Sequence, residues 1–209
     1  MSYGLAGAQR LGKTTLAKAF ADETGVKFVP TGATATFERL GLDPKVDYPF
    51  DVRLRIQQEI LRDCDRLYEK SGVRFITDRS PIDFLGYLLA DVTRANVPYR
   101  LAGDVQRYIA DCYACANRHF TTLVLVQPGI TLVDEEGKAP ANPIHIEHLS
   151  NLMLGLMANG MLKCDHFQIP RACTELDQRV AAVSQAVRKS ASRHSAKMEA
   201  MHETGLVLH

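Results

Sequence analysis

Residues 7–14 combine two glycines, a lysine and a threonine at the spacing of a phosphate-binding loop. The segment reads Gly-Ala-Gln-Arg-Leu-Gly-Lys-Thr, which matches the pattern G-x-x-x-x-G-K-T in full. In such a loop the backbone N–H groups form a nest for anions, and glycines let the backbone approach phosphates closely. We expect Lys13 to reach the β- and γ-phosphates of a nucleoside triphosphate, and the Thr14 hydroxyl to ligate Mg²⁺. The residues predicted to line the nucleotide here are Gly7, Ala8, Gln9, Arg10, Leu11, Gly12, Lys13, Thr14 and Thr15.

A second group of polar residues follows the apolar segment 73–77, where the chain continues with Asp78 and Arg79. A carboxylate that ends a buried strand is the usual partner of a phosphate-binding loop, because it holds Mg²⁺ through water or accepts the proton of an attacking hydroxyl. ATP-hydrolysing motors generally carry Glu at the next position, whereas Arg79 suits an anionic acceptor or a phosphoryl group in transfer. We expect Lys13, Asp78 and Arg79 to be catalytic, and Thr14 and Asp78 to bind the metal. An N-cap carboxylate beside a surface arginine is the structural alternative.

The elements that must position these residues alternate between strand and helix along the chain. Short apolar segments predict strands at 2–6, 26–30, 73–77, 120–126 and 165–169. Helical periodicity predicts helices at about 15–22, 50–70, 81–94, 101–117, 144–158 and 174–200. This succession predicts an α/β protein in which helices cover both faces of a parallel sheet, with ligands at the carboxyl ends of the strands.

Length, charge and cysteine content favour one domain without a membrane partner. The chain has 209 residues, a net charge of +1 and five cysteines. The length suits a single α/β domain over 1–209, and the balanced charge gives no global attraction for nucleic acid or membrane. An odd number of cysteines fits a reducing compartment, and no apolar run approaches a membrane span, so we expect a cytoplasmic protein. The sequence has no N-K-x-D motif, which argues against a GTPase.

Three segments together resemble the P-loop nucleoside and nucleotide kinase superfamily, namely residues 7–14, Asp78-Arg79-Ser80 and the Pro128-Gly129 loop before a final strand. More narrowly, the chain resembles the small NadR-like and phage-encoded AAA-type kinases of that group. The resemblance implies a three-layer P-loop kinase fold, in which a five-stranded parallel sheet carries helices on both faces and a small lid covers the triphosphate. It also implies ATP and Mg²⁺ as cofactors, and it assigns the Asp-Arg pair to the metal and the acceptor.

Residues 128–143, rich in Gly, Pro and acids, are the segment expected to form this lid. Many relatives place arginines in the lid to clamp the phosphates, whereas this segment contains only Lys138. We expect Lys138 to bind the nucleotide, and Arg10, inside the phosphate-binding loop, to be a further catalytic residue that reaches the γ-phosphate; simple solvent exposure is the alternative interpretation of Arg10. After the last predicted strand, Arg171 is placed to stack on the adenine ring.

We expect the acceptor to contact the segments that follow the second and third predicted strands. Nucleoside kinases supply an amide from a helix at the position of 50–70 to read the base edge, although a solvated helix face also explains such amides. The candidate hydroxyls, amides and neighbouring groups are Thr31, Thr34, Thr36, Gln57, Gln58, Asp83 and Tyr87.

The favoured function is ATP- and Mg-dependent transfer of the γ-phosphate to a hydroxyl or phosphate of a nucleoside or (deoxy)nucleotide. A first alternative keeps this chemistry but takes a hydroxymethylated base within DNA, held by the segment 171–197, whose six basic and two acidic residues give +4. A second alternative is a P-loop ATPase or switch without kinase activity. The Leu- and Met-rich helix at 144–158 fits either the chain's own core or the partner in a homodimer.

Overall fold

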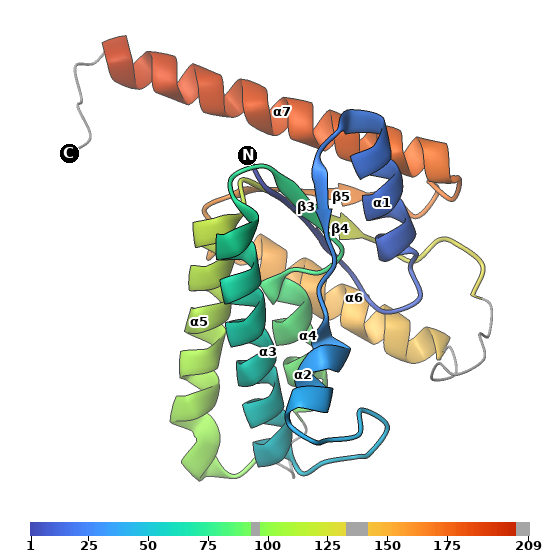
Figure 1. The fold of residues 1–209 in the computed structure, drawn as a ribbon, viewed down its shortest axis with the longest axis vertical. Coiled ribbons are helices and arrows are strands. Elements are labelled where there is room, and N and C mark those ends of the chain that lie inside the picture. The colour runs from blue at the N-terminus through green and yellow to red at the C-terminus, as the bar shows by residue number, and fades with distance from the viewer. Residues whose placement is uncertain (93–96, 133–141, 204–209) are drawn as a thin grey trace.

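The computed structural model describes residues 1–92, 97–132 and 142–203. Within these residues, five parallel strands form one sheet in the order β2-β3-β1-β4-β5 (Figure 1). The strands are β1 (Tyr3–Ala6), β2 (Lys27–Val29), β3 (Phe75–Thr77), β4 (Thr122–Val126) and β5 (Asp165–Ile169). The predicted five-stranded parallel sheet is therefore confirmed, and β1 lies at its centre.

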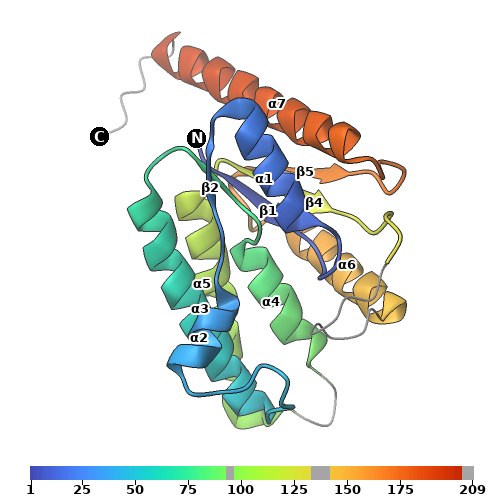
Figure 2. The same cartoon turned by 45° about the vertical axis from the view of Figure 1, so that its right-hand side comes forward.

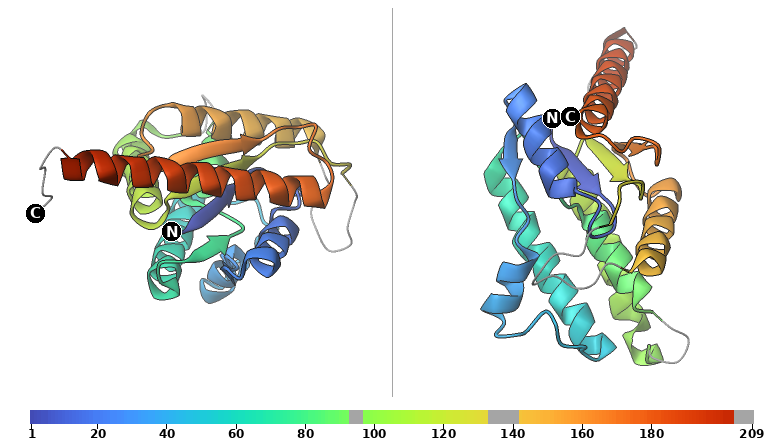
Figure 3. Two further views of the ribbon diagram at one scale, coloured as in Figure 1. Left: turned by 90° about the horizontal axis from the view of Figure 1, so that it is seen from above. Right: turned by 90° about the vertical axis from the view of Figure 1, so that its right-hand side faces the viewer.

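Helices cover both faces of the sheet, as Figures 2 and 3 show. One face carries α1 (Lys13–Thr24) and α7 (Leu176–Glu203), which pack against each other. The other face carries α3 (Phe50–Ser71), α4 (Pro81–Ala90), α5 (Ala102–His119) and α6 (Pro143–Ala158). The short α2 (Ala33–Arg39) packs on α3, and a single 3₁₀ turn (Tyr99–Leu101) precedes α5. This arrangement confirms the three-layer α/β fold.

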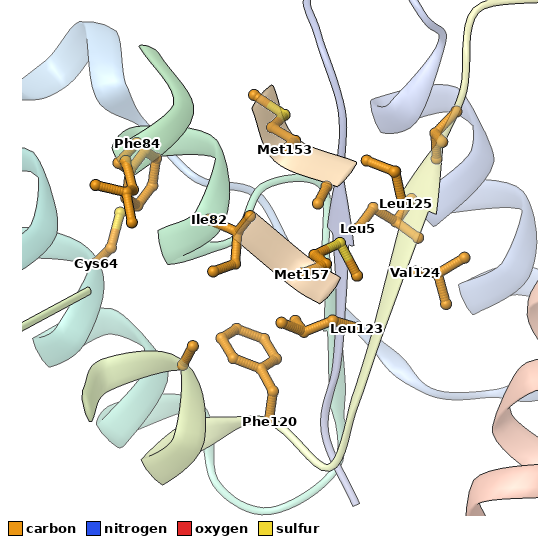
Figure 4. Close-up of a cluster of buried hydrophobic side chains, with 14 of the residues drawn as sticks. Leu5, Cys64, Ile82, Phe84, Phe120, Leu123, Val124, Leu125, Met153 and Met157 are labelled. Carbon is orange, nitrogen blue, oxygen red and sulfur yellow. The ribbon is translucent and has the colours of Figure 1, made fainter. Parts of the chain in front are cut away.

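The core between the sheet and its second face is built from aliphatic, aromatic and methionine side chains. Figure 4 shows Met157 of α6 near Ile82 of α4 and Leu123 of β4, with Met153 further along the same helix. These side chains are at most 3% exposed, and each contributes about 1.5–3 kcal/mol through its burial. Gly86 allows the close approach of α4 and α6, because a β-carbon there would lie 2.9 Å from two atoms of Met153. The two methionines of α6 thus pack on the chain's own core.

The register of the strands brings their carboxyl ends to one edge of the sheet. Ala6 of β1 pairs with Leu125 of β4, and Val29 of β2 pairs with Thr77 of β3. Because all strands run in the same direction, the loops after β1, β2 and β3 leave the sheet side by side. This edge is where the predicted chemistry was expected.

Some boundaries differ from those predicted. The third strand begins at Phe75 rather than at Val73, whose side chain is 82% exposed. The Thr-rich segment after β2 contains α2, a helix that was not predicted from the sequence. Within the described residues, no helix combines the length and apolar character needed to cross a bilayer.

The predicted lid is described only at its two ends. Residues 133–141, Lys138 among them, lie outside the described residues, so the lid and the role of Lys138 stay predictions. Its last residue, Pro143, is already the first residue of α6. The side chain of Asn142 caps this helix by accepting hydrogen bonds from the backbone N–H groups of Ile144 and His145.

Candidate active site

The phosphate-binding loop connects β1 to α1, and two glycines give it its shape. Gly12 is the N-cap of α1 and has a φ of 68°, in the left-handed region that glycine adopts at low cost. Gly7 packs so closely on the end of β4 that a β-carbon there would lie 2.6 Å from the carbonyl oxygen of Val126. No side chain caps the first turn of α1, so its N–H groups and the helix dipole favour an anion there.

Arg10 stands at the tip of this loop in an unfavourable backbone conformation. Its φ of 67° is the only positive φ of a non-glycine residue among the described part of the chain. A left-handed conformation costs such a residue roughly 1–2 kcal/mol, and strain of this kind gathers at functional loops. Arg10 is half-buried, and its role at the γ-phosphate stays a prediction.

Lys13 is folded into the loop, with its ammonium group buried. Its Nζ donates hydrogen bonds to the carbonyl oxygens of Gly7, at 2.6 Å, and Ala8, at 2.7 Å. The nearest carboxylate oxygen is Oδ1 of Asp83, at 3.6 Å. Burial lowers the pKa of Lys13 to about 8, although the charge of Asp83 acts in the opposite direction. The buried ammonium of Lys13 has only one carboxylate nearby, so a negatively charged phosphate would stabilise its protonated form.

Asp78 joins the phosphate-binding loop to the loop after β2. Its Oδ2 accepts a hydrogen bond from the hydroxyl of Thr14 at 2.7 Å. Its Oδ1 accepts from both the backbone N–H, at 3.1 Å, and the hydroxyl, at 2.8 Å, of Thr31. The predicted pair of Thr14 and Asp78 is therefore in direct contact, and Thr31, expected near the acceptor, lies on the same carboxylate.

Asp83 lies beneath the phosphate-binding loop, where sequence reasoning had not placed it. Its side chain is fully buried and accepts from the backbone N–H of Gly7 at 3.2 Å and from the N–H and hydroxyl of Ser80 at 3.0 Å each. Ser80 and Asp83 form a capping box at the start of α4, a signal visible in the sequence as Ser-Pro-x-Asp. Burial raises the pKa of Asp83, against the influence of Lys13 and Arg79.

Arg79 is held against the aromatic ring of Tyr87 on α4. Its guanidinium carbon lies 5.5 Å from the ring centroid, a cation–π geometry. The Tyr87 hydroxyl in turn donates to the side-chain oxygen of Gln9 in the phosphate-binding loop at 2.7 Å. Burial lowers the pKa of Arg79, but Tyr87, Asp83 and Asp78 outweigh it and the pKa is raised. Burial also raises the pKa of Tyr87, so its hydroxyl stays protonated as a donor.

Two further arginines, Arg171 and Arg179, follow β5 in the chain and have different surroundings. Arg171 forms a two-pronged ion pair with Glu147 of α6, with N–O distances of 2.5 and 2.7 Å, and it also donates to Gln127. Its stacking on adenine stays a prediction. Arg179 of α7, which the sequence analysis treated only as part of a basic helix, is buried and donates to the carbonyl oxygen of Leu11 in the phosphate-binding loop at 2.5 Å.

Gln57 and Gln58 of α3, both predicted near the acceptor, have different surroundings. The Oε1 atom of Gln57 is buried and has no hydrogen-bond partner among the described residues. Gln58 instead lines an outer groove of about 610 Å³ between α3 and α5. A buried amide oxygen without a partner costs free energy unless a ligand or water supplies a donor. Gln57 is therefore the better candidate of the two for a hydrogen bond to an acceptor molecule.

The residues present fit a magnesium nucleotide. Thr14 donates its hydroxyl proton to Asp78, which leaves the lone pairs of the hydroxyl for a cation. Hydroxyl and carboxylate oxygens are the hard ligands that Mg²⁺ prefers. The ammonium of Lys13 and the first turn of α1, which no side chain caps, lie beside them, so groups suited to an anion and groups suited to a divalent cation are adjacent.

Comparisons with known proteins find similarity in structure only. No family model matches the chain, and no curated protein matches its sequence. A deoxyadenosine kinase from M. mycoides with bound dCTP aligns with a TM-score of 0.62 at 11% identity, over 90% of this chain and 100% of that one. A thymidylate kinase from Candida albicans aligns with a TM-score of 0.54 at 10% identity, over 91% and 92% of the two chains.

A third similar structure is a NadR protein in complex with NR, with a TM-score of 0.56 at 16% identity, over 88% of this chain and 49% of that one. At these identities the likeness establishes the fold. The chain has the fold of the P-loop nucleoside and nucleotide kinases, as the phosphate-binding loop and the Asp-Arg turn after β3 predicted.

Proposed function

We propose that the protein is a phosphotransferase that uses ATP and Mg²⁺ and moves the γ-phosphate to a hydroxyl or phosphate of a nucleoside or (deoxy)nucleotide. One observation carries this proposal: the hydroxyl of Thr14, at the first turn of α1, lies 2.7 Å from the carboxylate of Asp78, at the end of β3. The contact joins the residue that follows the phosphate-binding lysine to the only acid of the Asp-Arg turn.

Each residue of this edge has a distinct role in the proposed reaction. Lys13 neutralises charge on the β- and γ-phosphates, and Arg79 and Arg10 stabilise charge that develops on the group in transfer. Asp78 either accepts the proton of the attacking hydroxyl or, with Thr14, holds Mg²⁺. Bound there, Mg²⁺ would neutralise phosphate charge and orient the triphosphate.

Asp83 has a positioning role rather than a chemical one. It accepts the N–H of Gly7 at the start of the loop and lies opposite Lys13, so it fixes both in place. The side chain of Asp83 is 0% exposed, so an acceptor molecule cannot reach its carboxylate. The carboxylate available for proton transfer is therefore that of Asp78.

The acceptor class rests on the unpartnered Oε1 atom of Gln57 and on the neighbours in structure. Two of those neighbours carry the names deoxyadenosine kinase and thymidylate kinase, and one deoxyadenosine kinase structure holds the products dCMP and dCDP. The buried Oε1 atom of Gln57 offers an acceptor to an N–H group on the edge of a base. We therefore favour a free nucleoside or nucleotide as the acceptor.

A hydroxymethylated base within DNA is the less favoured acceptor. Of the six basic side chains at 171–197, Arg171 and Arg193 are in ion pairs and Arg179 is buried. The exposed cations that remain there are Arg188, Lys189 and Lys197. Three cations along one helix give a weaker hold on a phosphate backbone than six.

The experiment that tests this proposal supplies γ-labelled ATP and Mg²⁺ with a panel of nucleosides, nucleotides and DNA containing hydroxymethylated bases. We expect label in a free nucleoside or nucleotide. Label in DNA, lost steeply as salt rises, would favour the alternative acceptor. Label only in free phosphate with every acceptor would contradict both kinase proposals and favour an ATPase.

A further inference from the structure

The last turns of α3 and α5 bring three metal-ligating side chains together, far along the chain from the phosphate-binding loop. Asp65 lies on α3, and Cys115 and His119 lie on α5. The two helices end just before β3 and β4 begin, so this Asp65-Cys115-His119 cluster lies towards the amino ends of the strands. The loops of the candidate active site leave the carboxyl ends. The cluster is therefore separate from that site.

The three ligand atoms of this cluster converge on one point. Cys115 and His119 are four residues apart on one helix, which places both side chains on the same face. Oδ1 of Asp65 lies 2.7 Å from Nε2 of His119 and 3.4 Å from Sγ of Cys115, and all three atoms lie within 4.8 Å of one another. Tetrahedral zinc, with bonds of about 2.0–2.3 Å, holds its ligand atoms roughly 3.3–3.6 Å apart. The sulfur–oxygen distance meets this requirement, and the nitrogen–oxygen distance is shorter because a hydrogen bond joins that pair.

Neighbouring side chains orient two of these ligands. The buried ring of Tyr68 meets the ring of His119 edge to face, with the centroids 5.6 Å apart. Nη1 of Arg118 lies 3.3 Å from Oδ2 of Asp65, whereas Cys115 and His119 contact Oδ1. Partners of this kind hold a ligand in the orientation that a metal requires. Oδ1 of Asp65 is thus the oxygen that faces the other two ligands.

The cluster is enclosed on one side and open to a groove on the other. Cys115 is 2% exposed, and the side chains of His119 and Asp65 are 11% and 33% exposed. Asp65 and Cys115 also line the outer groove between α3 and α5, through which an ion and a water molecule as fourth ligand can enter. A thiolate and a carboxylate together balance the two charges of a divalent cation, which limits the cost of burying it.

We propose that the Asp65-Cys115-His119 cluster binds Zn²⁺, and that the Cys115 thiol releases its proton to solvent as the metal–sulfur bond forms. Thiolate and imidazole ligands favour zinc, whereas Mg²⁺ prefers oxygen ligands, so this ion differs from the one expected beside Thr14. The bound zinc joins α3 to α5 and stabilises the fold. The inference does not rest on the proposed function, because no residue of the cluster belongs to the candidate active site.

Zinc binding by the full chain, stripped with EDTA and kept reduced, tests this inference. We expect one tightly bound Zn²⁺ per chain in competition with a chromophoric chelator. Cys115→Ala and Asp65→Asn each remove one ligand and should weaken binding at least about a hundredfold, since outer-shell partners alone are worth about 10–100-fold. Cys112→Ala is the matched control, because it removes an equally buried thiol about one turn earlier on α5 and should bind zinc as the wild type does.

Two further readouts separate loss of the metal from loss of the fold. Co²⁺ bound to a thiolate absorbs through charge transfer from sulfur to metal, so the wild type and Cys112→Ala should show this band and Cys115→Ala should not. Zinc should raise the unfolding temperature of the wild type but not that of Asp65→Asn, which replaces a partly exposed side chain. A wild type that binds no zinc, or wild-type zinc affinity in either ligand variant, would overturn the inference. An equal loss of zinc affinity in Cys112→Ala would overturn it as well.

Discussion

Replacement of Asp83 by asparagine is the perturbation with the largest effect that the structure allows us to work out. Both carboxylate oxygens accept hydrogen bonds only from N–H and O–H donors: Oδ1 from Gly7, and Oδ2 from the backbone and hydroxyl of Ser80. Since every neighbour is a donor, the group must act as an acceptor at both oxygens, and the ionised form does so. The ammonium of Lys13, 3.6 Å from Oδ1, adds the counter-charge.

In Asp83→Asn, one oxygen becomes an NH₂ group that faces donors, and the negative charge beside Lys13 is lost. Removal of one partner from a buried ion pair costs about 3–5 kcal/mol. A buried donor left without its acceptor costs about 1–3 kcal/mol. Lys13 keeps the carbonyl oxygens of Gly7 and Ala8, so the two costs overlap and we expect a loss of about 3–5 kcal/mol in the free energy of unfolding.

Urea unfolding of the ligand-free protein measures this loss. With a slope of about 2 kcal/mol per molar urea, the midpoint of Asp83→Asn should fall by about 1.5–2.5 M. Asp104→Asn is the matched control, because Asp104 forms an exposed pair with Arg107 at 3.4 Å, worth less than about 1 kcal/mol. If the midpoint of Asp83→Asn moves no further than that of the control, Asp83 does not anchor the loop as we describe.

Three further predictions concern the loop and the carboxylate beside it. Asp78→Asn should lower phosphoryl transfer at least a hundredfold, in the range of general base catalysis, while ATP binding measured by calorimetry persists; undiminished turnover would exclude Asp78 as the catalytic carboxylate. Phosphates favour the protonated form of Lys13, whose pKa is about 8, so the affinity for ATP should fall as the pH rises above 8, with proton uptake on binding. The ligand-free fold should instead gain stability between pH 8 and 10.5, because the unfolded state binds more protons there. An ATP affinity, measured by calorimetry, that stays constant from pH 7 to 9.5 would contradict this prediction. Arg10→Gly relieves a left-handed φ, so the free energy of unfolding should stay within about 1 kcal/mol of the wild type while kcat falls at least tenfold; unchanged kcat would remove Arg10 from the site.

The fold and the centre of the site could be predicted from sequence because their signals are local. The phosphate-binding loop is one continuous segment, and Asp78 follows its strand directly. The alternation of apolar strands with amphipathic helices is likewise visible in short windows, and it led to the parallel sheet that the structure has. The strand order then places the two segments at one edge.

The remaining parts of the site depend on contacts between distant segments. Asp83 reaches the N–H of Gly7 across 76 residues, and Arg179 reaches Leu11 across 168. In the sequence, Arg179 is one of several cations on a helix, and only the packing of α7 against α1 shows that it is buried. Asp83 has a local sequence signal, the capping box with Ser80. That signal predicts where a helix begins, but it does not predict that Asp83 contacts Gly7.

We propose that this edge of the sheet transfers phosphate to an acceptor and does not merely hydrolyse ATP. The most direct measurement is the ratio of label in a nucleoside or nucleotide acceptor to label in free phosphate, from γ-labelled ATP, for the wild type and Asp78→Asn. We predict that most label enters the acceptor in the wild type, and that Asp78→Asn loses this transfer. Label that appears in free phosphate alone, at the same rate with and without acceptor, would contradict the account.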